Sequence, residues 1–192
     1  MMQGLQAMKD SAALLVYWDG EASDISWPEP CIVEYVTNGQ GRINSMSKEA
    51  VNAMIADQDM SVHDLISIGN IRKKYSPQTS TEKTVMQTVI GDMMSVYPSE
   101  SYGIIFGSHG SGWLPTITGT RSIGQDGGRY SSDTALIPEL AEVLRTVNPQ
   151  KFDFVLFDAC MMGCAEVYYE LKDAAKYLSL IHISEPTRHA QI

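Results

Sequence analysis

The sequence predicts an α/β fold with a mostly parallel β-sheet. Apolar runs of strand length alternate with helical segments over most of the chain, an arrangement typical of a parallel sheet covered on both faces. The expected strands are 12–18, 31–37, 102–106 and 152–157, and the clearest helices are 81–96 and 134–147. The chain has 192 residues, of which 44% are hydrophobic and 19% charged, as in one globular domain with a sizeable core.

The first half of the chain contains both strand and helix signals. Turn residues bound the two apolar runs, and Asn38-Gly39 predicts a hairpin that returns through Arg42-Ile43. The apolar residues of Ser61–Lys74 match neither the helical nor the strand period clearly. The expected elements are the end of a helix near Lys9, strands Ala12–Trp18 and Cys31–Thr37, and a helix over Ser47–Asp57.

The second half repeats a strand-helix pattern. Thr81 is the expected N-cap of a helix whose apolar face carries Val85, Val89, Met93 and Val96. A loop rich in glycine, threonine and serine is expected from Gly107 to about Ser132. The other expected elements are strand Tyr102–Phe106, helix Thr134–Val147, strand Phe152–Phe157 and helix Gly163–Lys172.

The last stretch has an unusual composition. Residues Leu178–Arg188 resemble the conceptual translation of a common transposase sequencing adapter. We therefore predict one partial domain over 1–177 and a non-native tail over 178–192; the alternative is a genuine apolar strand with a polar tail. Of the four histidines, His182 and His189 fall in this tail, which leaves His63 and His109 as candidates for catalysis.

Charge and cysteine content exclude several classes of function. The formal net charge of -9 repels phosphate backbones, so nucleic-acid binding is not expected. No apolar run reaches the roughly 18–20 residues that span a bilayer, and no signal peptide is visible after Met1. The three cysteines, Cys31, Cys160 and Cys164, have neither disulfide-framework nor metal-ligand spacing, and no metal or other cofactor is expected.

His109 and Cys160 each follow a buried strand directly. If these two strands are parallel neighbours joined by the helix near 134–147, their carboxyl ends open into the same crevice. A thiolate is a strong nucleophile, and a neighbouring imidazole generates or stabilises it. The backbone N–H groups of Gly110 and Cys160 are candidate oxyanion donors.

Two motifs resemble those of clostripain-like cysteine peptidases. The segment Ile104–Trp113 (IIFGSHGSGW) is similar to the histidine motif of that family, and Phe154–Gly163 (FVLFDACMMG) is similar to its cysteine motif. The segment Ala165–Leu171 also resembles the helix that follows the cysteine motif in that family. The resemblance is strong from Tyr102 to Tyr177 and is not visible between about Pro28 and Pro77.

The resemblance implies a caspase-like three-layer α/β sandwich and an endopeptidase that cleaves after Arg or Lys. In this family pattern Cys160 is the nucleophile, His109 the general base and Asp158 the partner of the basic P1 side chain. Self-cleavage sites are expected at Arg121 and Arg129. Some members respond to calcium, but no calcium-loop motif is present. Such peptidases are usually exported by bacteria, to the outside, the periplasm or the cell surface.

The resemblance also implies an incomplete domain. The family pattern continues past the cysteine motif and begins before Met1, so we expect the 192-residue chain by itself to be inactive or unstable. Two other functions stay open. One is a non-catalytic peptide-binding or scaffold homologue of the same fold; the other is a phosphate- or nucleotide-binding domain, although the GxGxxG pattern and the P-loop lysine are both absent.

The remaining candidate residues have simpler interpretations. His63 is expected on the surface, Cys31 in a strand and Cys164 on a buried helix face. Trp113 is expected to pack under its loop, and Asp126 and Asp133 are expected to be solvated loop acids.

Overall fold

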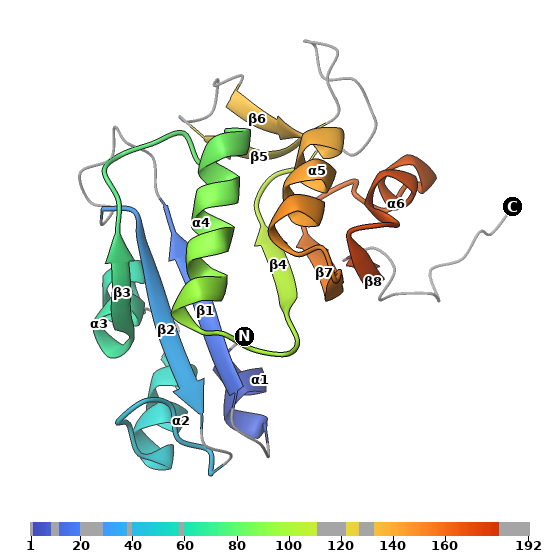
Figure 1. Ribbon diagram of the computed structural model, residues 1–192. Coiled ribbons are helices and arrows are strands. Elements are labelled where there is room, and N and C mark those ends of the chain that lie inside the picture. Colours follow the sequence, from blue (N-terminus) through green and yellow to red (C-terminus); the bar gives the residue numbers. More distant parts are fainter. Residues whose placement is uncertain are drawn as a thin grey trace, which may run out of the picture. The chain divides into compact units, whose positions relative to one another are not determined.

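The computed structural model describes residues 2–8, 12–19, 29–37, 40–57, 60–110, 122–126 and 133–180. The chain forms two compact units, Met1–Gln78 and Thr79–Ile192, and each is described by itself (Figure 1).

The first unit is built on an antiparallel sheet of order β1-β2-β3. Strand β1 (Ala12–Trp18) pairs with β2 (Cys31–Thr37), and β2 pairs with β3 (Asn70–Lys74). The helices of this unit are α1 (Met2–Ala7), α2 (Lys48–Ala56) and α3 (Val62–Ile68). The ambiguous segment 61–74 therefore divides into a helix and a strand. Strand β3 escaped prediction because its sequence, NIRKK, has a single apolar residue; all five positions are exposed.

The core of the first unit lies against β2, whose residues 31–35 are all buried. The Tyr35 hydroxyl donates to the Leu65 carbonyl (2.7 Å), which ties this strand to α3. On the same strand Glu34 is buried and pairs with Arg72 of β3 (3.4 Å). The buried carboxylate therefore has a partner of opposite charge. The apolar core residues are Leu5, Cys31, Val33, Tyr35, Ile43, Val51, Met54 and Ile66.

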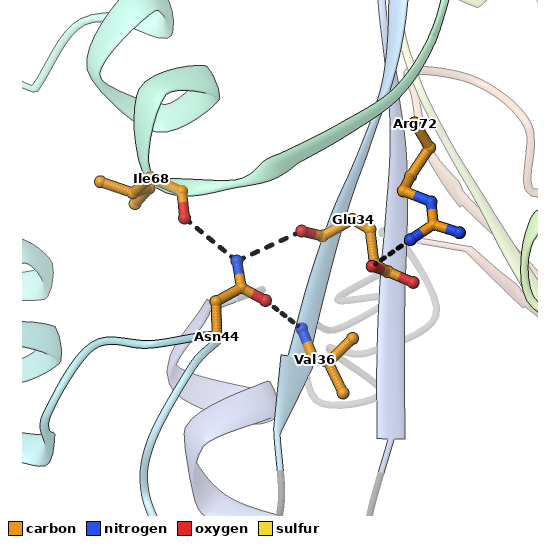
Figure 2. Close-up of polar contacts among 5 residues, drawn as sticks. All are labelled: Glu34, Val36, Asn44, Ile68 and Arg72. Atoms are coloured by element: carbon orange, nitrogen blue, oxygen red, sulfur yellow. Dashed lines mark hydrogen bonds and ion pairs between the residues drawn. The ribbon is translucent and has the colours of Figure 1, made fainter.

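Asn44 joins three segments of the first unit (Figure 2). Its amide nitrogen donates to the carbonyls of Glu34 (3.3 Å) and Ile68 (3.0 Å), and its amide oxygen accepts from the Val36 N–H (2.9 Å). The Asn44 N–H also donates to the Val36 carbonyl (2.8 Å). Within the described residues, the hairpin expected through Arg42-Ile43 is not formed: β2 pairs with β1 and β3, and the segment after it is hydrogen-bonded to β2 through Asn44. The φ of Asn44 is 50°, in the left-handed region that asparagine tolerates.

The second unit contains the parallel sheet that the sequence predicts. Strand β7 (Phe152–Asp158) lies between β4 (Gly103–Gly107) and β8 (Ala175–Leu180), and both pairings are parallel. Its core lies between this sheet and α4 (Lys83–Val96), α5 (Ile137–Val147) and α6 (Ala165–Leu171). Strand β8 includes the first three residues of the adapter-like stretch, pairing Val155 with Leu178. The non-native origin of that stretch stays a prediction.

The second unit also holds a short antiparallel pair that the sequence does not reveal. Strands β5 (Ser122–Asp126) and β6 (Asp133–Leu136) pair within the segment expected to be a loop and the start of a helix. Helix α5 begins at Ile137, later than expected, because Pro138 fits the first helical turn and the residues before it are extended.

Three further details of the expected helices are wrong. Helix α4 has Glu82 at its N-cap, not Thr81, and it buries Met86, Val89 and Ile90. The buried face is therefore rotated from the expected Val85-Val89-Met93-Val96 stripe. Helix α6 begins at Ala165, two residues after the expected Gly163.

We expect Asn44→Ala to lower the free energy of unfolding by about 2–3 kcal/mol. Alanine leaves backbone groups of Glu34, Val36 and Ile68 unpaired and is unfavourable at a positive φ. Urea unfolding followed by circular dichroism measures the change. Asn52→Ala is the matched control, because Asn52 lies on the exposed surface of α2 and its loss is expected to cost no more than about 0.5 kcal/mol. Equal effects of the two substitutions would contradict the role given to Asn44.

Candidate active site

The pairing of β4 with β7 brings the two motif loops to the same edge of the sheet. The register runs from Gly103 opposite Phe154 to Gly107 opposite Asp158, so the two strands end side by side. His109 and Cys160 each lie two residues beyond the last pair. The Ser108 N–H continues the contact by donating to the Asp158 carbonyl (3.3 Å). The expected parallel neighbours, joined through α5, are confirmed.

A second strand holds the backbone of His109. The Gly124 N–H of β5 donates to the His109 carbonyl (2.8 Å), and Gly110 forms a bridge with Ile123. Ile123 is buried in the core of the second unit. The histidine loop is thus fixed on one side by β7 and on the other by β5, while the His109 side chain remains exposed.

Gly110 lies in direct contact with the cysteine loop. A Cβ atom at this position would lie 2.6 Å from the Cys160 carbonyl oxygen, 3.0 Å from Met162 Sδ and 3.2 Å from Ala159 Cβ. Real Cβ atoms essentially never approach a backbone oxygen so closely, so only glycine permits this contact. The backbone after His109 therefore rests against the backbone of Cys160.

Cys160 lies at the exposed tip of a turn. Ala159 and Met162 are buried on either side, and Cys160 and Met161 between them are exposed. Helix α6 begins only after its N-cap, Cys164, so Cys160 lies outside the first helical turn. Because the helix-dipole effect falls off within that turn, its contribution to a Cys160 thiolate is small.

Two backbone donors at the contact have no acceptor within the described ranges. Neither the Gly110 N–H nor the Cys160 N–H donates a hydrogen bond to any residue that the structure describes. For Gly110 this follows from the β5 pairing, in which the neighbouring His109 carbonyl takes the hydrogen bond. Across residues 60–110 and 133–180, no hydrogen bond joins the His109 ring to the Cys160 thiol. Such bonds are often formed only when substrate is bound.

Asp158 is the last residue of β7 and is exposed. Its backbone carbonyl accepts from Ser108, but its carboxylate forms no ion pair with the described part of the chain. Strand alternation places its side chain on the sheet face opposite buried Phe157.

The other predicted residues lie apart from this contact or outside the description. Arg121, Arg129 and Trp113 fall outside the described residues. His63 is exposed on α3, Cys31 is buried in β2 and Cys164 is half-buried at the start of α6. Asp126 and Asp133 are paired in the β5-β6 register, so both are strand residues and not the loop residues expected. Among the described residues, no three His, Cys, Asp or Glu side chains form a group that could hold a metal ion.

A family model matches residues 1–190 of the chain, and its description is the clostripain family. The chain belongs to the clostripain family. This match includes the segment between Pro28 and Pro77, where the resemblance was not visible by eye. A search of curated proteins finds no significant match.

Two solved structures confirm the caspase-like α/β fold expected from the resemblance. One is a secreted C11 cysteine protease from Bacteroides thetaiotaomicron in complex with an irreversible peptide inhibitor. It is 29% identical with a TM-score of 0.61, over 91% of this chain and 40% of that chain. The other, a secreted C11 cysteine protease from the same organism called iotapain, is 18% identical with a TM-score of 0.56, over 86% and 40%. This clostripain-family chain therefore spans about 40% of their length. No helix in the described part of the chain is long and apolar enough to cross a membrane.

We expect Gly110→Ala to lower kcat/KM of the full-length gene product by roughly 10- to 100-fold. The added Cβ must separate the two loops, and a displacement of about 1 Å between reacting groups costs about that much. Steady-state hydrolysis of a peptide reporter and thermal unfolding are measured together.

Gly107→Ala is the matched control for this substitution. A Cβ at Gly107 meets no atom within 4 Å, although Gly107 lies only two residues before His109. We expect this variant to retain parental activity. Equal losses in the two variants would show that the loop tolerates no side chain anywhere and that the Gly110 contact has no special importance.

Proposed function

We propose that the protein is a cysteine endopeptidase that cleaves peptide bonds after Arg or Lys. The observation that carries the proposal is the contact between Gly110 and Cys160, which joins the histidine and cysteine motifs through adjacent parallel strands. Membership of the clostripain family supports the class of reaction, and the 29% identical neighbour is a cysteine protease with a bound peptide inhibitor.

In the proposed mechanism, Cys160 and His109 carry out acyl transfer. The Cys160 Sγ attacks the scissile carbonyl carbon while His109 takes the thiol proton, which it then gives to the leaving amine. The resulting thioester is hydrolysed by water, with His109 as the base. These steps use Cys160, His109 and water. A response to calcium stays an expectation from the family resemblance.

The unused N–H groups of Gly110 and Cys160 support a role in oxyanion binding. Both lie at the contact between the two loops, and neither is committed to another described residue. Donors already in place when negative charge develops on the carbonyl oxygen stabilise the transition state without reorganisation. In this proposal they bind the oxyanion of the tetrahedral intermediate.

Asp158 is proposed to bind the basic P1 side chain. It lies two residues before Cys160, at the end of the strand that presents the nucleophile, and its carboxylate has no ion-pair partner in the described structure. A carboxylate that accepts hydrogen bonds from a guanidinium or ammonium group forms a charge-assisted pair. Self-cleavage at Arg121 and Arg129 and export from a bacterial cell also belong to this proposal. The secreted neighbour supports the export.

The proposal is tested with the full-length gene product on reporter peptides that end in Arg, Lys or Glu. We expect cleavage after Arg and Lys only, and a loss of at least about 10³-fold in Cys160→Ala, because the nucleophile is removed. His109→Ala is expected to show a similar loss. A folded protein that cleaves none of the reporters but still binds an Arg peptide would instead favour a non-catalytic peptide-binding homologue.

Asp158→Asn tests the specificity assignment separately. We expect the ratio of kcat/KM for an Arg reporter to that for a Gln reporter to fall roughly 10- to 100-fold, as for the loss of a hydrogen bond to a charged group. Asp153→Asn is the matched control, since Asp153 lies near the other end of the same strand and pairs with Lys176 (2.6 Å). An unchanged ratio in Asp158→Asn would remove Asp158 from the P1 site.

A further inference from the structure

Met161, which follows the proposed nucleophile, has an unusual backbone conformation. Its φ is 60°, in the left-handed region that few residues other than glycine and asparagine adopt. Its side chain is 48% exposed, so packing of that side chain in the core does not explain the conformation. A backbone held in a disfavoured region is a reason to look for a role in function.

The surrounding contacts show where the turn that contains Met161 is anchored. Ala159 and Met162 are buried, and both approach Gly110, at 3.2 Å and 3.0 Å from its ideal Cβ position. The turn therefore contacts Gly110 at Ala159 and again at Met162, and only Cys160 and Met161 between them are exposed. Of the common two-residue reversals, type I turns have negative φ at both central residues and type II turns have a positive φ at the second; here the second residue, Met161, has the positive φ.

We propose that Met161 is a positioning residue, whose left-handed backbone holds Cys160 at the exposed tip of the turn beside the histidine loop. This inference rests on the proposed function, because it concerns the placement of the same nucleophile. Its physical content is that the backbone of residue 161, and not the thioether side chain, sets the reactive geometry. Residues that tolerate a positive φ should then substitute for methionine, and residues that resist it should not.

The test compares Met161→Gly, Met161→Asn and Met161→Val in the full-length gene product. Glycine and asparagine tolerate the left-handed region, so we expect kcat within about threefold of the parent. Valine resembles methionine in its apolar character but is β-branched. A β-branched residue therefore resists the left-handed conformation that the turn needs. We expect this conformational cost to reduce the population of the reactive turn by roughly 5- to 30-fold, and kcat to fall by that factor with KM nearly unchanged.

The pattern across the three variants decides between backbone and side chain. If the Met161 side chain instead contacts substrate, the polar and truncated variants lose activity, mainly through KM, and the apolar valine variant retains it. That result would overturn the proposal. So would a loss of tenfold or more in a Met161→Gly or Met161→Asn variant whose thermal unfolding matches that of the parent. These two variants keep the test decisive even if Met161→Val fails to fold.

A second measurement does not depend on peptidase activity. The rate at which iodoacetamide alkylates Cys160, followed by mass spectrometry of the Cys160 peptide, reports the exposure and environment of the thiol. We expect parental rates in the glycine and asparagine variants and a changed rate in the valine variant. If the parent cleaves no reporter, the proposed function fails while this order of alkylation rates still supports the turn. Identical rates in all variants would overturn the positioning role.

Discussion

The candidate site depends on one close approach of two backbones, that of Gly110 against Cys160. Parallel pairing of β4 with β7 aligns the strand ends, but pairing alone leaves the following loops free to diverge. The contact of Gly110 with the carbonyl of Cys160 and the buried side chains of Ala159 and Met162 locks the loops together. This contact holds together the backbones that carry the His109 imidazole, the Cys160 thiol and the two proposed amide donors.

The histidine loop needs a second support, which β5 provides. The hydrogen bond from Gly124 to the His109 carbonyl and the bridge between Ile123 and Gly110 fix the loop from the side away from β7. Because these contacts use backbone groups, they hold the loop without occupying the His109 side chain. His109 and Cys160 are both exposed on backbone segments that these contacts hold in place.

The sequence predicts the half of the site that depends on apolar strands. The runs at Tyr102–Phe106 and Phe152–Phe157 are read easily, and parallel pairing then places His109 near Cys160. Strand β5 is not predictable in this way, since Ile123 is the one apolar residue in its sequence and its pairing with β6 makes it a strand. The same holds for the φ of Met161 and for Asn44, whose conformations depend on contacts that no local pattern encodes. The antiparallel β1-β2-β3 sheet is not predicted, because β3 has one apolar residue among five and carries no strand signal.

The separation of His109 and Cys160 along the chain has a consequence for the order of folding. The two residues are 51 positions apart, and closing a flexible loop of that length costs about 3.5 kcal/mol in chain entropy, beyond a constant term. In the folded protein, pairing of β4 with β7 and packing of α5 offset this cost. In the unfolded chain nothing offsets it, and the cysteine lies apart from the histidine. During synthesis the histidine emerges first and remains without its partner until β7 has joined the sheet. The reactivity of the proposed pair therefore arises and disappears together with the folded sheet.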